Sequence, residues 1–266
     1  MPAPVLYQVR PRATGPDCAT GPDCATCRGP VGPGYARCYQ CERHDLLGPG
    51  LLADAVVPVS YAVKGTAWAA DLWRYKSGPA PDAPARAWLR ALLLVFLRDH
   101  GTCVWRQAGM PPPTRLAVVP TGCGRPGPHP LLRLVGPHLG LPTAPLAIRP
   151  GRQGRELDPD RFLAGRLPDA PSVLLLEDSW VSGASAQSAA AALKRAGARQ
   201  VAIVVAGRHL NPADPHAAPL AARLTSAPYD PSVCAVHPPA DREPNGANLS
   251  AQRIDSFPCT KEKVLV

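Results

Sequence analysis

The feature that most constrains the fold lies at residues 173–195, where an apolar run, two acids, a loop of small residues and an alanine-rich segment follow one another. The apolar run at 173–176 is typical of a buried strand, and the alanine-rich residues 186–196 favour a helix. Glu177 and Asp178 stand between them, at the end of the expected strand. The sequence therefore predicts a strand that turns into a helix, the building unit of an α/β fold.

The loop of this unit has the chemistry of a phosphate–sugar site. Amide groups in the first turn of a helix have no partner within the helix, and the helix dipole favours an anion there. Gly183 allows the backbone to approach a phosphate closely, and Ser182 and Ser185 can donate hydroxyl hydrogen bonds. Glu177 and Asp178 are placed to accept hydrogen bonds from ribose hydroxyls. The alternative is an ordinary strand–helix turn in which the carboxylates are solvated.

These residues resemble the signature by which type I phosphoribosyltransferases bind phosphoribosyl diphosphate (PRPP): a hydrophobic strand, an acidic pair, two variable residues and a Ser/Thr-Gly-x-Ser/Thr loop. The resemblance covers residues 173–185 and departs at Trp180, where the family usually has a small aliphatic residue. It implies a mostly parallel sheet flanked by helices, and PRPP bound with Mg²⁺. It makes Glu177 and Asp178 the catalytic residues at the ribose hydroxyls and the metal region. It assigns the 5-phosphate to Val181, Ser182, Gly183, Ala184 and Ser185.

A second loop follows the apolar residues 116–120, which predict the first core strand. In the family, the loop after this strand binds the diphosphate through backbone amide groups. Two glycines here suit a close approach of the backbone, and the guanidinium of Arg125 adds a positive charge suited to phosphate. The resemblance assigns the diphosphate to Thr121, Gly122, Gly124 and Arg125.

Four cysteines near the N-terminus have the spacing of a two-knuckle zinc ribbon. They are Cys24, Cys27, Cys38 and Cys41. Each Cys-x2-Cys pair can present two thiolates from one turn, and two such turns complete a tetrahedral Zn²⁺ shell with no open position, which implies a structural role. Cys18 lies in a short duplicated segment and is expected to be a spare, whereas His44 could replace one cysteine. The alternative is a set of free or redox-active cysteines.

The segment Leu-Trp-Arg-Tyr-Lys-Ser-Gly at residues 72–78 resembles a stretch of ComF-type, competence-associated phosphoribosyltransferases. Those proteins also carry an N-terminal cysteine ribbon ahead of the phosphoribosyltransferase domain. The resemblance implies that Lys76 reaches the diphosphate, and the alternative is a solvated helix end. It also implies that the basic residues 149–161 form a mobile hood that excludes water from the ligand. The proline-rich residues 126–130 depart from the ComF pattern.

The chain is expected to have four parts. They are a zinc-ribbon region at 1–47, a helical segment leading into the core at 48–112, a phosphoribosyltransferase-like α/β domain at 113–237, and an irregular or disordered tail at 238–266. In the α/β domain, residues 200–206 predict a further strand, and Cys234 with His237 has the spacing of a metal-ligand pair. A buried strand residue is the alternative for Cys234.

Helices are expected at 68–75, 85–100 and 131–139. In the first, Trp68, Leu72 and Tyr75 share one face. In the second, Gly101 stands where a C-terminal stop belongs. The apolar face expected for that second helix consists of Trp88, Leu92, Val95 and Phe96.

The net charge of +9 suits a polyanionic ligand, either a diphosphate or a nucleic acid. The longest apolar run, at 91–97, is too short to span a bilayer, and residues 1–12 lack the apolar core of a signal peptide. A cytoplasmic protein with no membrane partner is therefore expected. The oligomeric state stays open, a homo-oligomer included.

Two functions from different classes fit these features. One is phosphoribosyl transfer from PRPP to an unknown acceptor, with a regulatory PRPP sensor as a variant of it. The other is a non-catalytic, ComF-like accessory module in DNA uptake or processing that binds single-stranded DNA or a helicase partner. Aromatic residues make up only 5% of the chain, which argues against base stacking. Glutamine hydrolysis is not expected, because residue 2 is proline and no N-terminal nucleophilic cysteine is present.

Overall fold

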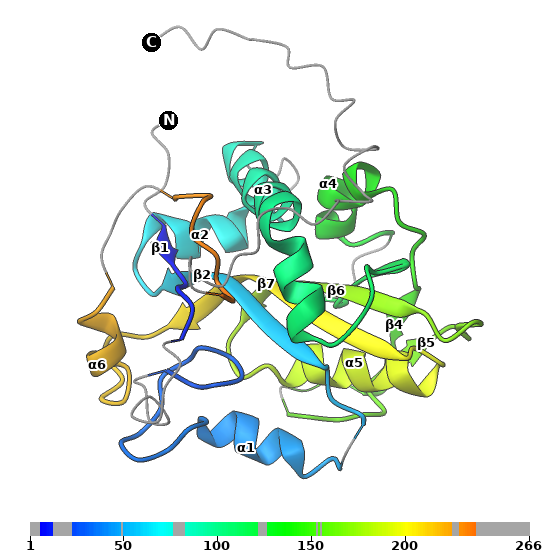
Figure 1. Ribbon diagram of the computed structural model, residues 1–266, viewed down its shortest axis with the longest axis horizontal. Helices are drawn as coiled ribbons and strands as arrows, with labels where there is room; N and C mark the ends of the chain where they lie inside the picture. The colour runs from blue at the N-terminus through cyan, green and yellow to red at the C-terminus, as the bar shows by residue number, and fades with distance from the viewer. Residues whose placement is uncertain are drawn as a thin grey trace, which may run out of the picture.

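A five-stranded sheet with the order β1-β2-β7-β6-β3 runs through the centre of the computed structural model (Figure 1). Strands β2, β7, β6 and β3 are parallel, and β1 pairs antiparallel with β2 at one edge. The strands are β1 (Tyr7–Gln8), β2 (Ala55–Val63), β3 (Arg115–Val118), β6 (Ser172–Trp180) and β7 (Gln200–Leu210). The α/β class and the mostly parallel sheet predicted from the sequence are confirmed. The structure describes residues 6–12, 23–48, 50–76, 83–121, 127–152, 154, 156–224 and 229–237.

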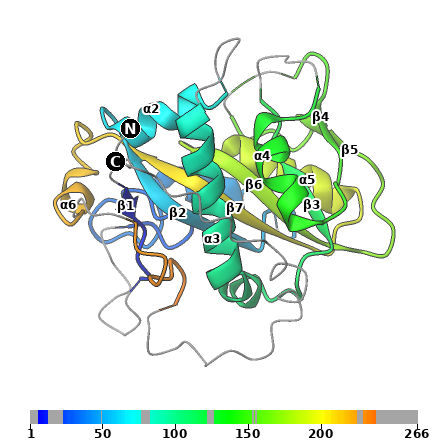
Figure 2. The same cartoon turned by 90° about the horizontal axis from the view of Figure 1, so that it is seen from above.

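Helices cover both faces of the sheet. On one face lie α2 (Ala67–Arg74), α3 (Ala83–Gln107) and α4 (Pro130–Leu139), and on the other lies α5 (Ala184–Arg195) (Figures 1 and 2). Side chains alternate along β6, so that Leu174 and Leu176 pack toward the first set of helices while Val173 and Leu175 pack toward α5. Both faces of the sheet are thus buried, which explains why its strands are continuous apolar runs.

The expected end of the second helix at Gly101 is wrong. Helix α3 continues to Gln107, and Gly109 follows it with φ of +60°, which suits a left-handed C-terminal cap. The amide of Met110 donates to the carbonyl of Trp105 at 2.9 Å, which closes the cap. The buried face is also shifted from the expected one, since Trp88 is 37% exposed. The buried side chains of α3 include Leu89, Leu92, Leu93, Phe96, His100 and Val104.

The sheet does not follow the expected division at residue 113. Strand β2 belongs to the segment 48–112, yet it pairs with β7 over most of its length, and β1 comes from the segment 1–47. The first two parts of the chain therefore contribute strands to the same sheet as the α/β domain. The tail at 238–266 lies outside the described residues.

The remaining elements are short. They are α1 (Tyr39–Asp45), α6 (Ala218–Ala221), and the antiparallel pair β4 (Leu146–Ile148) and β5 (Phe162–Ala164). The β4–β5 pair carries the basic loop that was expected to be a hood. Among the helices of the described ranges, none combines the length and the apolar character needed to cross a bilayer.

Candidate functional site

A hollow of about 900 Å³ opens at the carboxyl ends of the parallel strands. Residues 177–186, from the end of β6 through the first turn of α5, form one wall, and Thr121 after β3 and Lys76 after α2 border it. Open α/β sheets place their ligands at this edge, because the loops that follow the strands converge there. The structure thus brings the expected phosphate loop, acid pair, Thr121 and Lys76 to one hollow. Gly122, Gly124 and Arg125 lie outside the described residues.

The turn from β6 into α5 has the geometry of an anion site. Gly183 stands at the N-cap of α5 with φ of +82°, and its carbonyl accepts from the amide of Gln187 at 2.9 Å. No side chain of the N-cap residue satisfies the amides of the first turn, because that residue is glycine. The amide of Ala184 lies 3.4 Å from the Ser182 Oγ. Residues 185 and 186 also line the hollow, and their first-turn amides can serve a bound anion.

Trp180, the departure from the resemblance, lies beneath this turn. Its side chain is 1% exposed, and a Cβ added to Gly183 would lie 2.0 Å from the indole Cζ2. The indole therefore packs directly against the loop at Gly183, and Trp180 is also among the residues that line the hollow. Strand β6 also runs through the acid pair to Trp180, so Glu177 and Asp178 belong to the strand and do not follow it.

Asp178 is buried and held by two residues from the end of α2. Its Oδ2 accepts from the Tyr75 hydroxyl and lies 2.8 Å from the Lys76 Nζ. Burial on its own would raise the pKa of Asp178, but the Lys76 charge and the hydrogen bonds from Lys76 and Tyr75 outweigh it, so the pKa is lowered. Asp178 is thus an ionised carboxylate, and Lys76 is held at the acid pair by its charge.

Glu177 beside it has the opposite character. Its side chain is partly exposed in the hollow, and its Oε1 accepts from the backbone amide of Asp178 at 3.1 Å. Desolvation, reinforced by the charge of Asp178, raises the pKa of Glu177 to about 8. At neutral pH the pair therefore holds one negative charge in the absence of a cation.

This raised pKa predicts a pH-dependent stability. Between the ordinary value of 4.5 and about 8, the unfolded chain releases the Glu177 proton while the folded chain keeps it, so stability falls as pH rises through this window. We expect Glu177→Gln to unfold with a free energy about 2–4 kcal/mol above wild type at pH 8.5 without Mg²⁺, and with no gain at pH 4.5. Urea unfolding at the two pH values measures this. Glu156→Gln, an exposed residue of the same hollow, is the control and should show no such difference.

The basic loop between β4 and β5 closes against the first turn of α5. Arg161 is buried, and its Nη1 donates to the Ser185 Oγ at 3.0 Å, while the amide of Asp158 donates to the Ser188 Oγ at 2.9 Å. Glu156 from this loop lines the hollow. A guanidinium thus stands beside the amides that an anion would contact, which adds a positive charge to the helix terminus.

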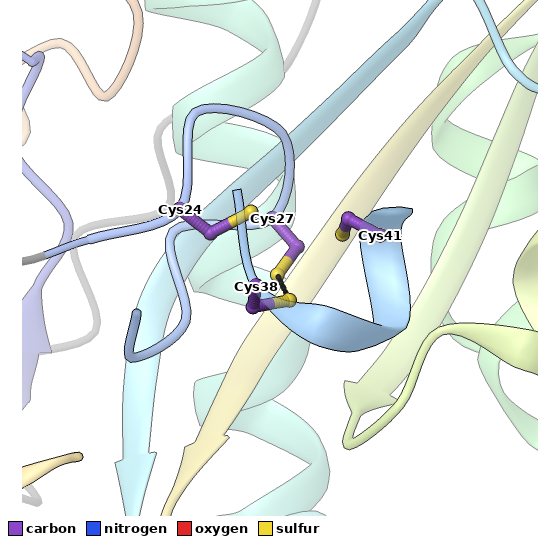
Figure 3. A group of neighbouring side chains, drawn as sticks. All are labelled: Cys24, Cys27, Cys38 and Cys41. Atoms are coloured by element: carbon purple, nitrogen blue, oxygen red, sulfur yellow. Dashed lines mark hydrogen bonds between the residues drawn. The ribbon is translucent and has the colours of Figure 1, made fainter. Parts of the chain in front are cut away.

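The four ribbon cysteines come together as the spacing predicts (Figure 3). Their sulfur atoms all lie within 4.8 Å of one another, and the Sγ atoms of Cys27 and Cys38 are 3.8 Å apart. Tetrahedral zinc with Zn–S bonds of about 2.3 Å separates its sulfurs by about 3.8 Å. Cys24, Cys27 and Cys41 are buried. The cluster could therefore hold a structural metal ion such as zinc.

The cysteine cluster is joined to the sheet through strands β2 and β7. The Tyr61 hydroxyl on β2 donates to the carbonyl of Arg28 at 3.0 Å. Arg208 on β7 is buried, donates to the carbonyl of Trp180 at 3.1 Å, and lies so close to Gly29 that a Cβ there would meet the guanidinium at 2.0 Å. The knuckle that contains Cys24 and Cys27 is thus held against the carboxyl ends of the central strands.

The helix of the ribbon forms a further wall of the hollow, which the sequence did not indicate. Gln40, Arg43 and His44 of α1 line it. His44 is buried, neither of its ring nitrogens has a hydrogen-bond partner among the described residues, and burial lowers its pKa. It lies outside the group of four sulfurs, so His44 replaces none of the cysteines. The sequence signal that could have pointed to His44 is its position three residues after Cys41 on the same helix.

Comparison with known proteins gave no match: no protein family, no curated protein and no solved structure is significantly similar to this chain.

Proposed function

We propose that this chain has a type I phosphoribosyltransferase fold and binds PRPP with Mg²⁺, transferring the phosphoribosyl group to an acceptor that remains to be identified. The observation that carries the proposal is the shared hollow, in which the amides at the start of α5 face the same space as Asp178. A phosphate at the helix terminus places the attached ribose toward the acid pair. The resemblance at residues 173–185 indicates that the ligand is PRPP, and the geometry of the hollow is compatible with that ligand.

In this proposal the 5-phosphate is held by residues 181–185, with the Arg161 charge behind Ser185. Glu177 and Asp178 accept from the ribose hydroxyls. Mg²⁺, which the resemblance places in the region of Glu177 and Asp178, would neutralise charge on the diphosphate and would lower the pKa of Glu177. The resemblance assigns the diphosphate to Lys76, Thr121, Gly122, Gly124 and Arg125.

The reaction breaks the bond between the ribose C1 and the diphosphate and forms a bond from C1 to the acceptor. Positive charge develops on the sugar as the diphosphate leaves, so positioning and charge stabilisation supply most of the catalysis. In this proposal the Asp178 carboxylate lies beside the ribose, where the positive charge develops. Lys76 is 24% exposed, so its ammonium has access to the hollow where negative charge develops on the leaving group.

Calorimetry with PRPP and Mg²⁺ tests the proposal. We expect Asp178→Asn to weaken PRPP binding by 100-fold or more, on the order of 3 kcal/mol, because it removes a buried charge and leaves Lys76 without its counterion. Asp160→Asn is the matched control: Asp160 is exposed, pairs with Arg195 at 2.7 Å, and should leave binding unchanged. Absence of PRPP binding by a folded wild-type chain would rule the proposal out. Diphosphate release with candidate acceptors then separates an enzyme from a PRPP sensor.

We further propose that the four ribbon cysteines bind a structural Zn²⁺. The sulfur separation, the burial of three thiols and the lack of an open position all support this assignment.

A DNA-handling function is the second candidate, favoured by exposed aromatic side chains on and beside the ribbon. Tyr35, Tyr39 and Trp73 are each about two-thirds exposed, and the guanidinium of Arg43 lies 5.7 Å from the Tyr39 ring centre. Exposed aromatics with cations are the parts of a single-strand binding platform. Steeply salt-dependent binding of single-stranded DNA, with no PRPP binding, would favour this candidate over phosphoribosyl transfer.

A further inference from the structure

A second group of metal-ligating side chains lies away from the ribbon cysteines, on the α3 side of the sheet. It consists of His100, Cys103 and Cys234, and one ligand atom from each lies within 4.8 Å of the others. His100 and Cys103 are three residues apart on α3 and therefore share one face of that helix. Cys234 comes from residues 229–237, the orange segment that runs beside β1 in Figure 2. Helix and segment are far apart in the sequence, and the three donors meet only in the fold.

The histidine of this group is oriented as a metal ligand would be. His100 is fully buried, and its Nε2 lies 2.7 Å from the carbonyl oxygen of Pro231. A carbonyl oxygen only accepts, so Nε2 carries the proton and Nδ1 carries the lone pair. Ligating histidines are commonly fixed in this way, with one ring nitrogen donating to a carbonyl while the other faces the metal.

The thiol of Cys234 is also prepared for ligation. The backbone amides of Val236 and His237 approach its Sγ at 3.3 Å and 3.4 Å. Two N–H donors stabilise the negative charge of a thiolate, whereas they add little to a neutral disulfide sulfur. Cys234 is buried and Cys103 is partly exposed, so Cys103 is the donor nearest to solvent.

We propose that His100, Cys103 and Cys234 bind a second Zn²⁺, with a water molecule in the fourth position. Two thiolates and an imidazole are the donor set that zinc prefers. The sequence has a matching symmetry, with His-x2-Cys on α3 and Cys-x2-His in the partner segment. His237 has a buried Nδ1 with no hydrogen-bond partner among the described residues, but its ring lies outside the group of three donors.

Such a metal would attach residues 229–237 to α3. The segment is already held at β1, where Gln8 Nε2 donates to the carbonyls of Asp230 at 2.7 Å and Val233 at 3.2 Å. The metal would add a second attachment, on α3. His100 of that helix already contacts the carbonyl of Pro231, which lies 131 residues away in the chain. It would therefore stabilise the end of the described chain against the helix layer, independently of the PRPP hollow.

The test is the zinc content of the full chain, purified under reducing conditions and measured by elemental analysis. We expect Cys103→Ser and Cys234→Ser each to hold one zinc less per chain than wild type, while Cys24→Ser with Cys27→Ser keeps the zinc of the second group. Cys18→Ser, at the cysteine that the duplicated segment predicts to be a spare, should equal wild type. Unchanged zinc in the Cys103 and Cys234 variants, or a Cys103–Cys234 disulfide in the reduced preparation by mass spectrometry, would overturn the proposal.

A second measurement guards against misfolding. Cys103 is the least buried of the three donors, so Cys103→Ser should perturb packing least, and circular dichroism checks that it is folded. In the Cys24→Ser, Cys27→Ser background, added Co²⁺ should give a thiolate-to-cobalt charge-transfer band that Cys234→Ser removes. A band of unchanged intensity in that triple variant would also overturn the proposal.

Discussion

Gly183→Ala should reduce PRPP binding at least 100-fold and lower the free energy of unfolding by about 3 kcal/mol. Gly183 has φ of +82°, which an alanine adopts only with strain, and its added Cβ would lie 2.0 Å from the Trp180 ring. Because Trp180 is buried, the ring cannot move aside, and the start of α5 must shift instead. The amides of residues 185 and 186 would then leave the position that the phosphate requires. Calorimetry with PRPP and chemical unfolding measure the two effects.

Two further variants separate the causes of this effect. Gly140→Ala has a similar conformation, with φ of +62°, but a Cβ there meets nothing within 4 Å, so it should cost only about 1 kcal/mol and leave binding intact. Trp180→Val removes the ring that the alanine would strike. In that background, Gly183→Ala should cost less than in wild type, a coupling that a double-mutant cycle measures. Equal effects of Gly183→Ala in both backgrounds would show that Trp180 does not support the loop.

The local patterns of the sequence predicted the elements well, because each strand and helix is encoded by its own residues. The apolar runs of β6 and β7 and the alanine-rich α5 are examples, and the face of α2 with Trp68, Leu72 and Tyr75 is buried as expected. The end of α3 was misplaced because Gly101 looks like a stop, although it lies in the helix interior and is not among the glycines with positive φ. A glycine marks a helix end only when its own φ requires it, as at Gly109.

Contacts between distant segments could not be predicted in this way. The local pattern gave no sign that Lys76 and Tyr75 would both contact Asp178, and Tyr75 was expected only to share a helix face with Trp68 and Leu72. The Arg208 guanidinium between Trp180 and Gly29 joins two regions with no shared local pattern. Cys234 was weighed as a buried residue or a ligand, and only the fold shows that α3 supplies its neighbours. Each case depends on chain topology, which periodicity does not encode.

On the proposal that the ribbon cysteines bind Zn²⁺, we expect removal of this metal to have the largest effect on the free energy of unfolding. Cys24, Cys27 and Cys41 belong to the same buried cluster as Trp180 and the alanines of α5, so the ribbon packs directly on the support of the phosphate loop. Structural zinc in small sites contributes apparent binding free energies of about 10–16 kcal/mol. We expect Cys27→Ser or a strong chelator to unfold residues 23–48, to expose Trp180 and to weaken PRPP binding at least tenfold. Zinc content, tryptophan fluorescence and calorimetry measure the three outcomes.

The fold specifically predicts that loss of the ribbon metal weakens PRPP binding in the hollow. A ribbon that served only as a separate module could lose its metal with no effect on PRPP, whereas here α1 lines the hollow and Arg208 connects the knuckle to the carbonyl of Trp180. Cys18→Ser is the matched control and should retain the metal, the fluorescence and the affinity. Arg208→Lys keeps the charge but not the planar fork. In this variant the cysteines should still bind zinc, and removal of that zinc should reduce PRPP binding less than it does in wild type. Full PRPP affinity in a metal-free, unfolded ribbon would contradict this arrangement.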